Sequence, residues 1–155
     1  MDNIINLLKS KKLTLSSCES ITGGGFANYI TNIPDASCIY KGGLVTYSND
    51  IKMHIANIKK ETIQKYGAIS KECAYEMAKN TKEIFNSDIC VSFTGNAGPA
   101  ASESKKVGLI YIGFAYKDIV DVKEYFLKGS RSDIKNTCIK IALEKIINEI
   151  VKELS

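Results

Sequence analysis

The sequence predicts an α/β protein with three layers, in which helices cover both faces of a mixed sheet. Helical patterns of apolar residues alternate along the chain with short runs of β-branched and aromatic residues. Glycine-bearing loops at 19–25, at 42–43 with the turn 48–50, and at 94–98 each follow a predicted strand. The chain has 155 residues, a length that suits one domain, which we expect to span residues 1–155.

The first part of the chain predicts a helix, a strand and a second helix. Apolar residues over 4–8 have helical spacing, and residues 13–17 alternate as in a strand. Gly23, Gly24 and Gly25 lie where this strand turns into the next helix. Glycines at such a turn allow close packing of helix on strand, and the helix that follows exposes its first N–H groups to an anion.

The middle of the chain predicts a kinked strand and a long helix. Residues 38–47 are rich in β-branched and aromatic side chains and predict a strand, with a bulge or kink at Gly42 and Gly43. A polar turn at 48–50 and short helical pieces follow. Ser70 predicts the N-cap of a helix whose apolar residues recur every three or four positions.

The last part of the chain predicts three strands and a helix. Residues 89–93 are a short apolar strand, and residues 107–116 are apolar on both alternating sets, as in a central strand covered on both faces. Residues 120–126 alternate apolar with polar side chains and predict a strand nearer an edge. Apolar spacing from Ile139 onwards predicts a long C-terminal helix that begins near Ser132.

Composition excludes several classes of protein. The net charge of +4 is too small and too dispersed to predict nucleic-acid binding. Five widely spaced cysteines without a CxxC motif predict neither a disulfide framework nor a zinc cluster, and fit a reducing cytosol. The sequence has no apolar run near the ~18 residues of a membrane span. We therefore expect a cytoplasmic protein that binds neither nucleic acid nor membrane.

The residue types also restrict the chemistry. One histidine, His54, leaves little room for histidine-based catalysis, and no metal or cofactor is expected. Hydroxyl nucleophiles activated by lysine or tyrosine fit better, although composition does not choose among the many hydroxyls in the loops. The single arginine, Arg131, lies where the last helix is expected to begin and suits a bidentate grip on phosphate or carboxylate.

Six short motifs make the chain resemble the CinA C-terminal domain family over nearly its whole length. They are Glu19-Ser20-Ile21-Thr22-Gly23-Gly24, Gly43-Leu44-Val45-Thr46-Tyr47-Ser48-Asn49, Gly67-Ala68-Ile69-Ser70, Thr94-Gly95-Asn96-Ala97-Gly98-Pro99, Val107-Gly108 and Gly129-Ser130-Arg131. Similar proteins include amidases that hydrolyse the carboxamide of nicotinamide mononucleotide to nicotinate mononucleotide and ammonia. The resemblance implies a three-layer domain, a small mononucleotide substrate, no metal and a homodimer. Longer members carry a further N-terminal domain, so we expect the single-domain form.

The resemblance also implies catalytic roles for particular residues. Ser37 matches the family's serine about ten residues before the Val-Thr-Tyr-Ser-Asn motif, and is the implied nucleophile. Lys52 matches a lysine suited to act as general base, a role that Tyr47 also fits; Tyr47 alternatively orients the nucleophile or relays its proton. Thr94 and the amides near Gly95 would hold the substrate amide or its oxyanion.

A second group of residues is implied to bind the substrate. Arg131 and the 22–24 loop would take the phosphate. Further polar contacts would come from Ser20 and Thr22, and the loop residues are Thr22, Gly23 and Gly24.

Four positions depart from the usual family pattern, namely Ile21, Ala36, Asn96 and Ser130. The changes at Ala36 and Ser130 keep a second hypothesis open: a catalytically silent domain that binds a nucleotide or a partner associated with competence and DNA damage. A phosphatase or pyrophosphatase is disfavoured, because the sequence has no cluster of Asp, Glu and His residues to hold a metal.

Overall fold

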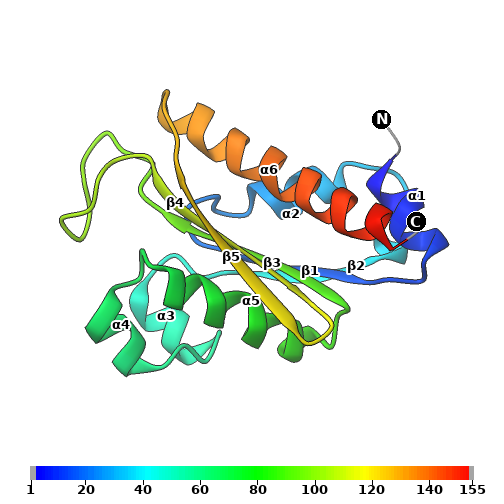
Figure 1. Ribbon diagram of the computed structural model, residues 1–155, viewed down its shortest axis with the longest axis horizontal. Coiled ribbons are helices and arrows are strands. Elements are labelled where there is room, and N and C mark those ends of the chain that lie inside the picture. The colour runs from blue at the N-terminus through cyan, green and yellow to red at the C-terminus, as the bar shows by residue number, and fades with distance from the viewer. Residues whose placement is uncertain (1–2, 154–155) are drawn as a thin grey trace.

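A five-stranded mixed sheet forms the middle layer of the protein, whose computed structural model describes residues 3–153 (Figure 1). The strand order is β2-β1-β3-β4-β5. The first three strands are mutually parallel, and the last two continue the sheet antiparallel. The strands are β1 (Leu15–Glu19), β2 (Tyr40–Val45), β3 (Ile89–Gly95), β4 (Leu109–Tyr116) and β5 (Ile119–Phe126).

Helices cover both faces of this sheet, so the predicted three-layer α/β architecture is confirmed (Figure 1). One face carries α1 (Ile4–Ser10), α2 (Gly25–Thr31) and α6 (Arg131–Lys152), and the other carries α3 (Asn49–His54), α4 (Lys60–Tyr66) and α5 (Lys71–Phe85). The larger core lies under the first set, where the rings of Phe26 and Phe93 are 5.4 Å apart. A smaller core around Cys18 and Met77 lies under α5.

Serine caps start three of the helices. Ser70 Oγ accepts a hydrogen bond from the Cys73 N–H, as the sequence predicted. Ser130 caps α6 in a reciprocal capping box with Asp133, and the helix begins at Arg131, one residue before the expected start near Ser132. The polar turn expected at 48–50 is the start of α3, capped by Ser48. Serine, asparagine and aspartate favour turns and N-caps alike, which explains this difference.

The second strand is kinked as predicted but shorter. Only Tyr40–Val45 pair as a strand, and Ala36–Cys38 form one turn of 3₁₀ helix. The register jumps from Leu15 opposite Tyr40 to Ser16 opposite Gly42, which leaves Lys41 as the bulged residue. Gly42 has a φ of 145°, and a Cβ at this position would lie 2.8 Å from the Phe85 ring. Glycine is therefore required beside the bulge.

The parallel arrangement brings three strand ends together. β5 forms one edge of the sheet, as predicted, while β1 and β3 lie inside it. The loops that follow β1, β2 and β3 thus leave the sheet at the same end, where layered α/β proteins bind ligands. Within residues 3–153, no helix is both long and apolar enough to cross a membrane.

Candidate active site

A pocket of about 290 Å³ lies at the carboxyl end of the parallel strands. The chain segments that follow β1, β2 and β3 form its walls, and the first residue of α6 reaches its mouth. Six of the residues predicted for the site line this pocket: Ser20, Tyr47, Lys52, Thr94, Gly95 and Arg131. The structure thus brings six of the ten predicted site residues together, although the contacts among them differ from expectation.

Lys52 and Ser20 are directly hydrogen-bonded in this pocket. Lys52 lies one turn after the Ser48 cap of α3, and only 2% of it is exposed. Its Nζ donates to Ser20 Oγ at 3.0 Å and to the Thr46 carbonyl oxygen at 2.8 Å. A serine hydroxyl paired with a lysine amine is the arrangement by which Ser–Lys hydrolases activate their nucleophile.

Burial favours the neutral amine of Lys52. It lowers the pKa of Lys52 below the usual 10.5, against the opposing influence of Cys73, Cys18 and Glu103. Burial also raises the pKa of the Cys73 thiol to about 12 and raises that of Cys18. Both thiols are thus uncharged at neutral pH, and they do little to stabilise an ammonium group. Lys52 is suited to accept a proton.

The end of β3 and the first residue after Ser20 supply polar groups for a substrate amide. Thr94 is 1% exposed, and its Oγ1 donates to the Ala68 carbonyl oxygen at 2.7 Å. The Thr94 hydroxyl proton is therefore committed, but its oxygen remains able to accept a hydrogen bond. The Ile21 N–H has no hydrogen-bond partner among residues 3–153, and Ile21 lines the pocket. It is the more available donor for an oxyanion.

Arg131 bridges two loops at the mouth of the pocket. Its Nη1 donates to the Gly98 carbonyl oxygen at 2.7 Å, and its Nη2 donates to the Tyr47 hydroxyl at 2.9 Å. The capping box of Ser130 fixes the turn from which Arg131 projects, so serine at this position still starts the helix. Tyr47 is 63% exposed and contacts Arg131 rather than Ser20. Of the two candidate bases, only Lys52 therefore contacts a hydroxyl on β1 or its loop.

Ser37, the expected nucleophile, is not part of this pocket. It is exposed on the 3₁₀ turn that precedes β2, whereas Lys52 follows β2. The Leu15 N–H donates to the Ile39 carbonyl oxygen, which places this turn at the amino end of β1. The six residues of β2 alone separate the two ends by roughly 17 Å. The expectation that Ser37 lies beside Lys52 is wrong, because the serine precedes the strand instead of following it.

The expected use of the α2 N-terminus by an anion is also wrong. Glu19 is fully buried, and its Oε1 accepts from the Phe26 N–H at 2.7 Å. Its Oε2 accepts from the Ala27 N–H at 3.1 Å. A carboxylate from the chain itself thus already satisfies these N–H groups and the positive end of the helix dipole.

Thr22, Gly23 and Gly24 line a second hollow of about 430 Å³ beside the first turn of α6. The same hollow is lined by Lys135, which has no ion-pair partner among residues 3–153. Ser20 and Arg131, which line the pocket, lie within two positions in the sequence of residues that line this hollow. The two cavities therefore lie next to each other, separated by the 20–22 segment and the start of α6.

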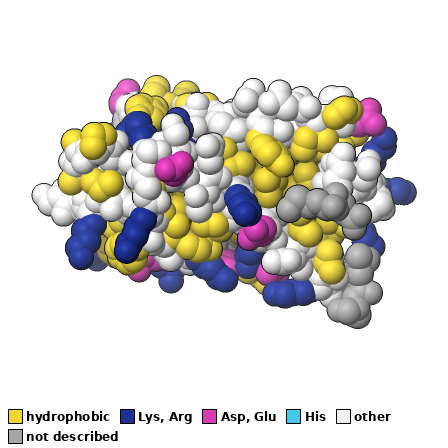
Figure 2. Space-filling model, turned by 90° about the horizontal axis from the view of Figure 1, so that it is seen from above, with side chains coloured by type: hydrophobic (Ala, Val, Ile, Leu, Met, Phe, Trp, Pro, Cys, Tyr) yellow, Lys and Arg dark blue, Asp and Glu magenta, His cyan; other side chains and the backbone are white. Residues whose placement is uncertain are grey.

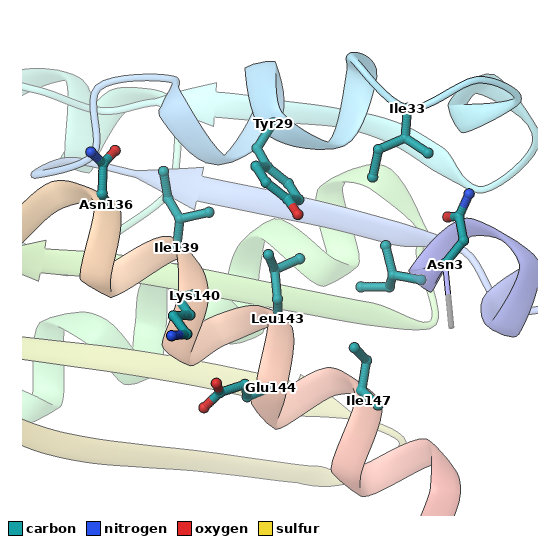
Figure 3. Close-up of a pocket in the computed structure, with 10 residues that line it drawn as sticks. Asn3, Tyr29, Ile33, Asn136, Ile139, Lys140, Leu143, Glu144 and Ile147 are labelled. Carbon is teal, nitrogen blue, oxygen red and sulfur yellow. The ribbon is translucent and has the colours of Figure 1, made fainter. Parts of the chain in front are cut away.

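A third cavity, of about 590 Å³, lies among α1, α2 and α6 (Figure 3). Its walls are apolar side chains such as Ile139, Leu143 and Ile147, with Lys140 and Glu144 at its border. Hydrophobic side chains are exposed on this helical face of the molecule (Figure 2). No hydroxyl of its lining residues is hydrogen-bonded to a lysine among residues 3–153. Among the described residues, the groove thus lacks a serine–lysine pair like that of the first pocket.

The chain matches a known protein family over almost its whole length. The model of the family described as "CinA C-terminal domain" matches residues 1–150. The chain belongs to the CinA C-terminal domain family. A CinA-family relative from Bacillus thuringiensis, named as a competence-damage inducible protein, is 46% identical over 140 residues, which are 90% of this chain and 34% of the relative. The chain thus spans about a third of the length of the curated relatives it matches.

Solved CinA structures have the same fold. The competence/damage inducible protein CihA from Agrobacterium tumefaciens is 32% identical, with a TM-score of 0.89 over 94% of this chain and 90% of that one. A competence damage-inducible protein from Klebsiella pneumoniae superposes with a TM-score of 0.93 over 96% of this chain and 92% of that one. Its identity of 23% supports the fold alone.

Three features of the site in this CinA domain escaped the sequence analysis. Ser20 was assigned to substrate binding, although it is the serine that contacts Lys52. Its position directly after a buried parallel strand is the available signal, because the residues that follow such a strand lie at this end of the sheet. Glu103 and Lys135 had no signal of their own, since both lie in segments that read as ordinary charged surface.

Proposed function

We propose that this CinA-family domain is a Ser–Lys amidohydrolase that converts the carboxamide of nicotinamide mononucleotide to nicotinate mononucleotide and ammonia. The observation that supports the proposal most is the 3.0 Å contact between buried Lys52 and Ser20 at the wall of a pocket. The nucleophile in this proposal is Ser20, because Ser37 has no base beside it.

Proton transfer between these two residues accounts for both halves of the reaction. Neutral Lys52 takes the Ser20 proton as Oγ attacks the carboxamide carbon. The resulting lysine ammonium then gives its proton to the leaving nitrogen, the C–N bond breaks, and ammonia departs from a Ser20 ester. In the second half, Lys52 takes a proton from water, which attacks the ester, and returns that proton to Ser20 Oγ.

The polar groups around the pair fit the carboxamide. The Ile21 N–H is free to stabilise the oxyanion, an interaction worth about 3 kcal/mol in the transition state when one donor is well placed. Thr94 Oγ1 has lone-pair capacity left for the substrate NH₂ group, since its own proton is bonded to Ala68. A neutral ammonia leaving group needs no further acid than the lysine ammonium formed in the first step.

The basic groups outside the pair fit a mononucleotide phosphate. Arg131 stands at the mouth with two of its five N–H groups bonded to protein acceptors, which leaves others for an anion. Lys135 and the Thr22–Gly24 wall lie in the adjoining hollow. A ligand with its carboxamide at Ser20 would extend past Arg131 toward this hollow, as a nucleotide phosphate requires.

Ammonia release from nicotinamide mononucleotide by the purified protein tests this function. We expect turnover that follows a rising pH profile, because only the neutral form of Lys52 accepts the serine proton. No ammonia from a folded protein that still binds the nucleotide would contradict the amidase and favour the silent binding domain.

The apolar groove of Figure 3 supports the implied homodimer. Leu143 and Ile147 line it, and Lys140 and Glu144 at its border form no ion pair among residues 3–153. If two copies place their α6 helices antiparallel, Lys140 of one copy faces Glu144 of the other twice, as a two-fold interface requires. Light scattering should give twice the chain mass, and Leu143→Glu should halve it.

A further inference from the structure

The pocket contains one carboxylate whose role the proposed reaction does not explain. Glu103 is the only acidic residue among those that line the pocket. It belongs to the segment between β3 and β4, which passes over the strand ends and also contributes Ala100 and Ser102 to the wall. A carboxylate in the wall of a pocket for an anionic phosphate ester calls for a specific reason, because it repels an anion.

The protein holds this carboxylate rigidly in its ionised form. Glu103 Oε1 accepts from the Ala68 N–H at 2.9 Å, and Oε2 accepts from the Ile69 N–H at 3.0 Å. Lys105 Nζ lies 3.4 Å from Oε2. Partial burial acts to raise the pKa of Glu103, but the two backbone N–H groups and Lys105 outweigh it, so the pKa is lowered. Glu103 is therefore negatively charged at neutral pH.

Lys105 pairs with this carboxylate but does not line the pocket. It donates to the carbonyl oxygens of Tyr66 and Ile69 and lines a different hollow, on the outer side of the 66–70 turn. The charged side chains that line the pocket are Glu103, Lys52 and Arg131, and burial shifts Lys52 toward its neutral form.

We propose that Glu103 selects a carboxamide carried on a positively charged ring. This inference rests on the proposed function and deepens it. The pocket then matches a zwitterionic substrate, with an anion at Arg131 and a cationic N-substituted pyridinium ring near Glu103. A neutral ring would gain no Coulomb attraction from the carboxylate, whereas a cationic ring a few ångströms away would gain about 1 to 4 kcal/mol, equivalent to roughly fivefold or more in affinity, depending on how far water screens the two charges.

Two substrates that share carboxamide, ribose and phosphate but differ in ring charge test this assignment, each compared between wild type and variant so that their different intrinsic reactivities cancel. Nicotinamide mononucleotide has a cationic ring, and its 1,4-dihydro form has a neutral ring with the same carboxamide, ribose and phosphate. We expect Glu103→Gln to lower kcat/KM for the cationic substrate about tenfold relative to the dihydro substrate. Glu103→Asp, which keeps the charge, should retain most of the wild-type ratio.

Lys105→Gln is the matched control for the structural role of this loop. The substitution removes the hydrogen bonds of Lys105 to the 66–69 turn and leaves the Glu103 charge in place. We therefore expect kcat/KM for both substrates to change by the same factor. If Glu103→Gln lowered kcat/KM by the same factor for both substrates, the proposal would be overturned, and Glu103 would have only a structural role.

Binding separates this inference from the amidase itself. Calorimetric titration of wild type and Glu103→Gln with both pyridine nucleotides reports ring-charge selection without any turnover. If wild type released no ammonia but the cationic nucleotide lost about tenfold in affinity in Glu103→Gln, the amidase would fail and the role of Glu103 would stand. Unchanged relative affinities would overturn the role of Glu103, whatever the turnover.

Discussion

The two ends of the parallel strands carry similar serines in very different surroundings. At the amino end, Ser37 is exposed on a 3₁₀ turn. At the carboxyl end, Ser20 is bonded to buried Lys52. A serine becomes a nucleophile only when a base lies within hydrogen-bond distance. Position relative to the strand, more than the local motif, thus decides which serine lies beside a lysine.

The ends also differ in how completely their polar groups are paired. Within the sheet, the Ser16 hydroxyl is 2.7 Å from Ser87 Oγ, and the Ser17 hydroxyl is 2.6 Å from Tyr40 Oη. Beyond the carboxyl end, Thr22 Oγ1 is buried and has no hydrogen-bond partner among residues 3–153, as is also true of Thr81 Oγ1 on α5. Unpaired buried polar groups are rare in folded proteins and lower stability. Removal of such a hydroxyl should therefore have the opposite effect on stability from removal of a paired one.

Replacement of Lys52 should have the largest effect. Lys52→Met keeps the length of the side chain but removes the base, so we expect kcat to fall by at least ~10³-fold. Steady-state ammonia release measures this loss. Lys9→Met, on α1 at the other end of the sheet, is the matched control and should leave kcat within about twofold. A kcat near that of wild type in Lys52→Met would contradict the assignment of Lys52 as the base at the carboxyl end of the sheet.

Arg131→Lys should have a smaller effect, confined mainly to substrate binding. Lysine keeps the charge but cannot bond Gly98 and Tyr47 in the fork geometry that the guanidinium provides. We expect KM for the mononucleotide to rise about tenfold while kcat changes less. Separate kcat and KM values check this prediction; a loss in kcat alone would point to a role in the chemical step.

The lowered pKa of Lys52 predicts a pH dependence of stability. The unfolded chain binds a proton at Lys52 up to pH 10.5, whereas the folded protein releases it earlier. Wild-type stability relative to Lys52→Met should therefore rise with pH between the folded-state pKa and 10.5, and stay flat below that window. Urea unfolding of both proteins across this range measures the difference. An opposite slope would mean that the folded protein favours the ammonium form.

Paired substitutions at the two kinds of hydroxyl should give the smallest effects, of opposite sign. Thr22→Val removes an unpaired buried hydroxyl at nearly constant shape and should raise the free energy of unfolding by about 1 kcal/mol. Ser17→Ala breaks the bond to Tyr40 and should lower it by about 1 kcal/mol. Chemical denaturation measures both values, and a loss in both variants would show that Thr22 is as well paired as Ser17.

Much of the fold could be predicted from the sequence, because periodicity and caps are local signals. The Ser70 cap, the bulge beside Gly42 and the doubly covered strand over 107–116 all follow from short stretches of chain. The contact between Ser20 and Lys52 spans 32 positions and depends on how β2 pairs with β1. No local pattern reports such a contact, so the sequence predicted six residues of the pocket but not that Ser20, rather than Ser37, lies beside Lys52.

Glu19 is a second contact that local patterns did not predict, at the start of α2 where an anion was expected to bind. The glycines correctly predicted that a helix begins here, but not the carboxylate that accepts hydrogen bonds from its first N–H groups. That carboxylate lies on the strand just before the turn, where its side chain can reach back over the helix start. Local glycine patterns describe the backbone conformation, whereas occupancy of the N–H groups depends on which side chain the fold brings to them.

The most direct test of the account is ammonia release from nicotinamide mononucleotide by Ser20→Ala and Ser37→Ala, measured side by side with wild type. We predict that Ser20→Ala retains the fold and loses turnover by at least ~10³-fold, while Ser37→Ala stays within about twofold of wild type. Turnover that survives in Ser20→Ala and disappears in a folded Ser37→Ala would contradict the assignment of the reaction to the carboxyl end of the sheet.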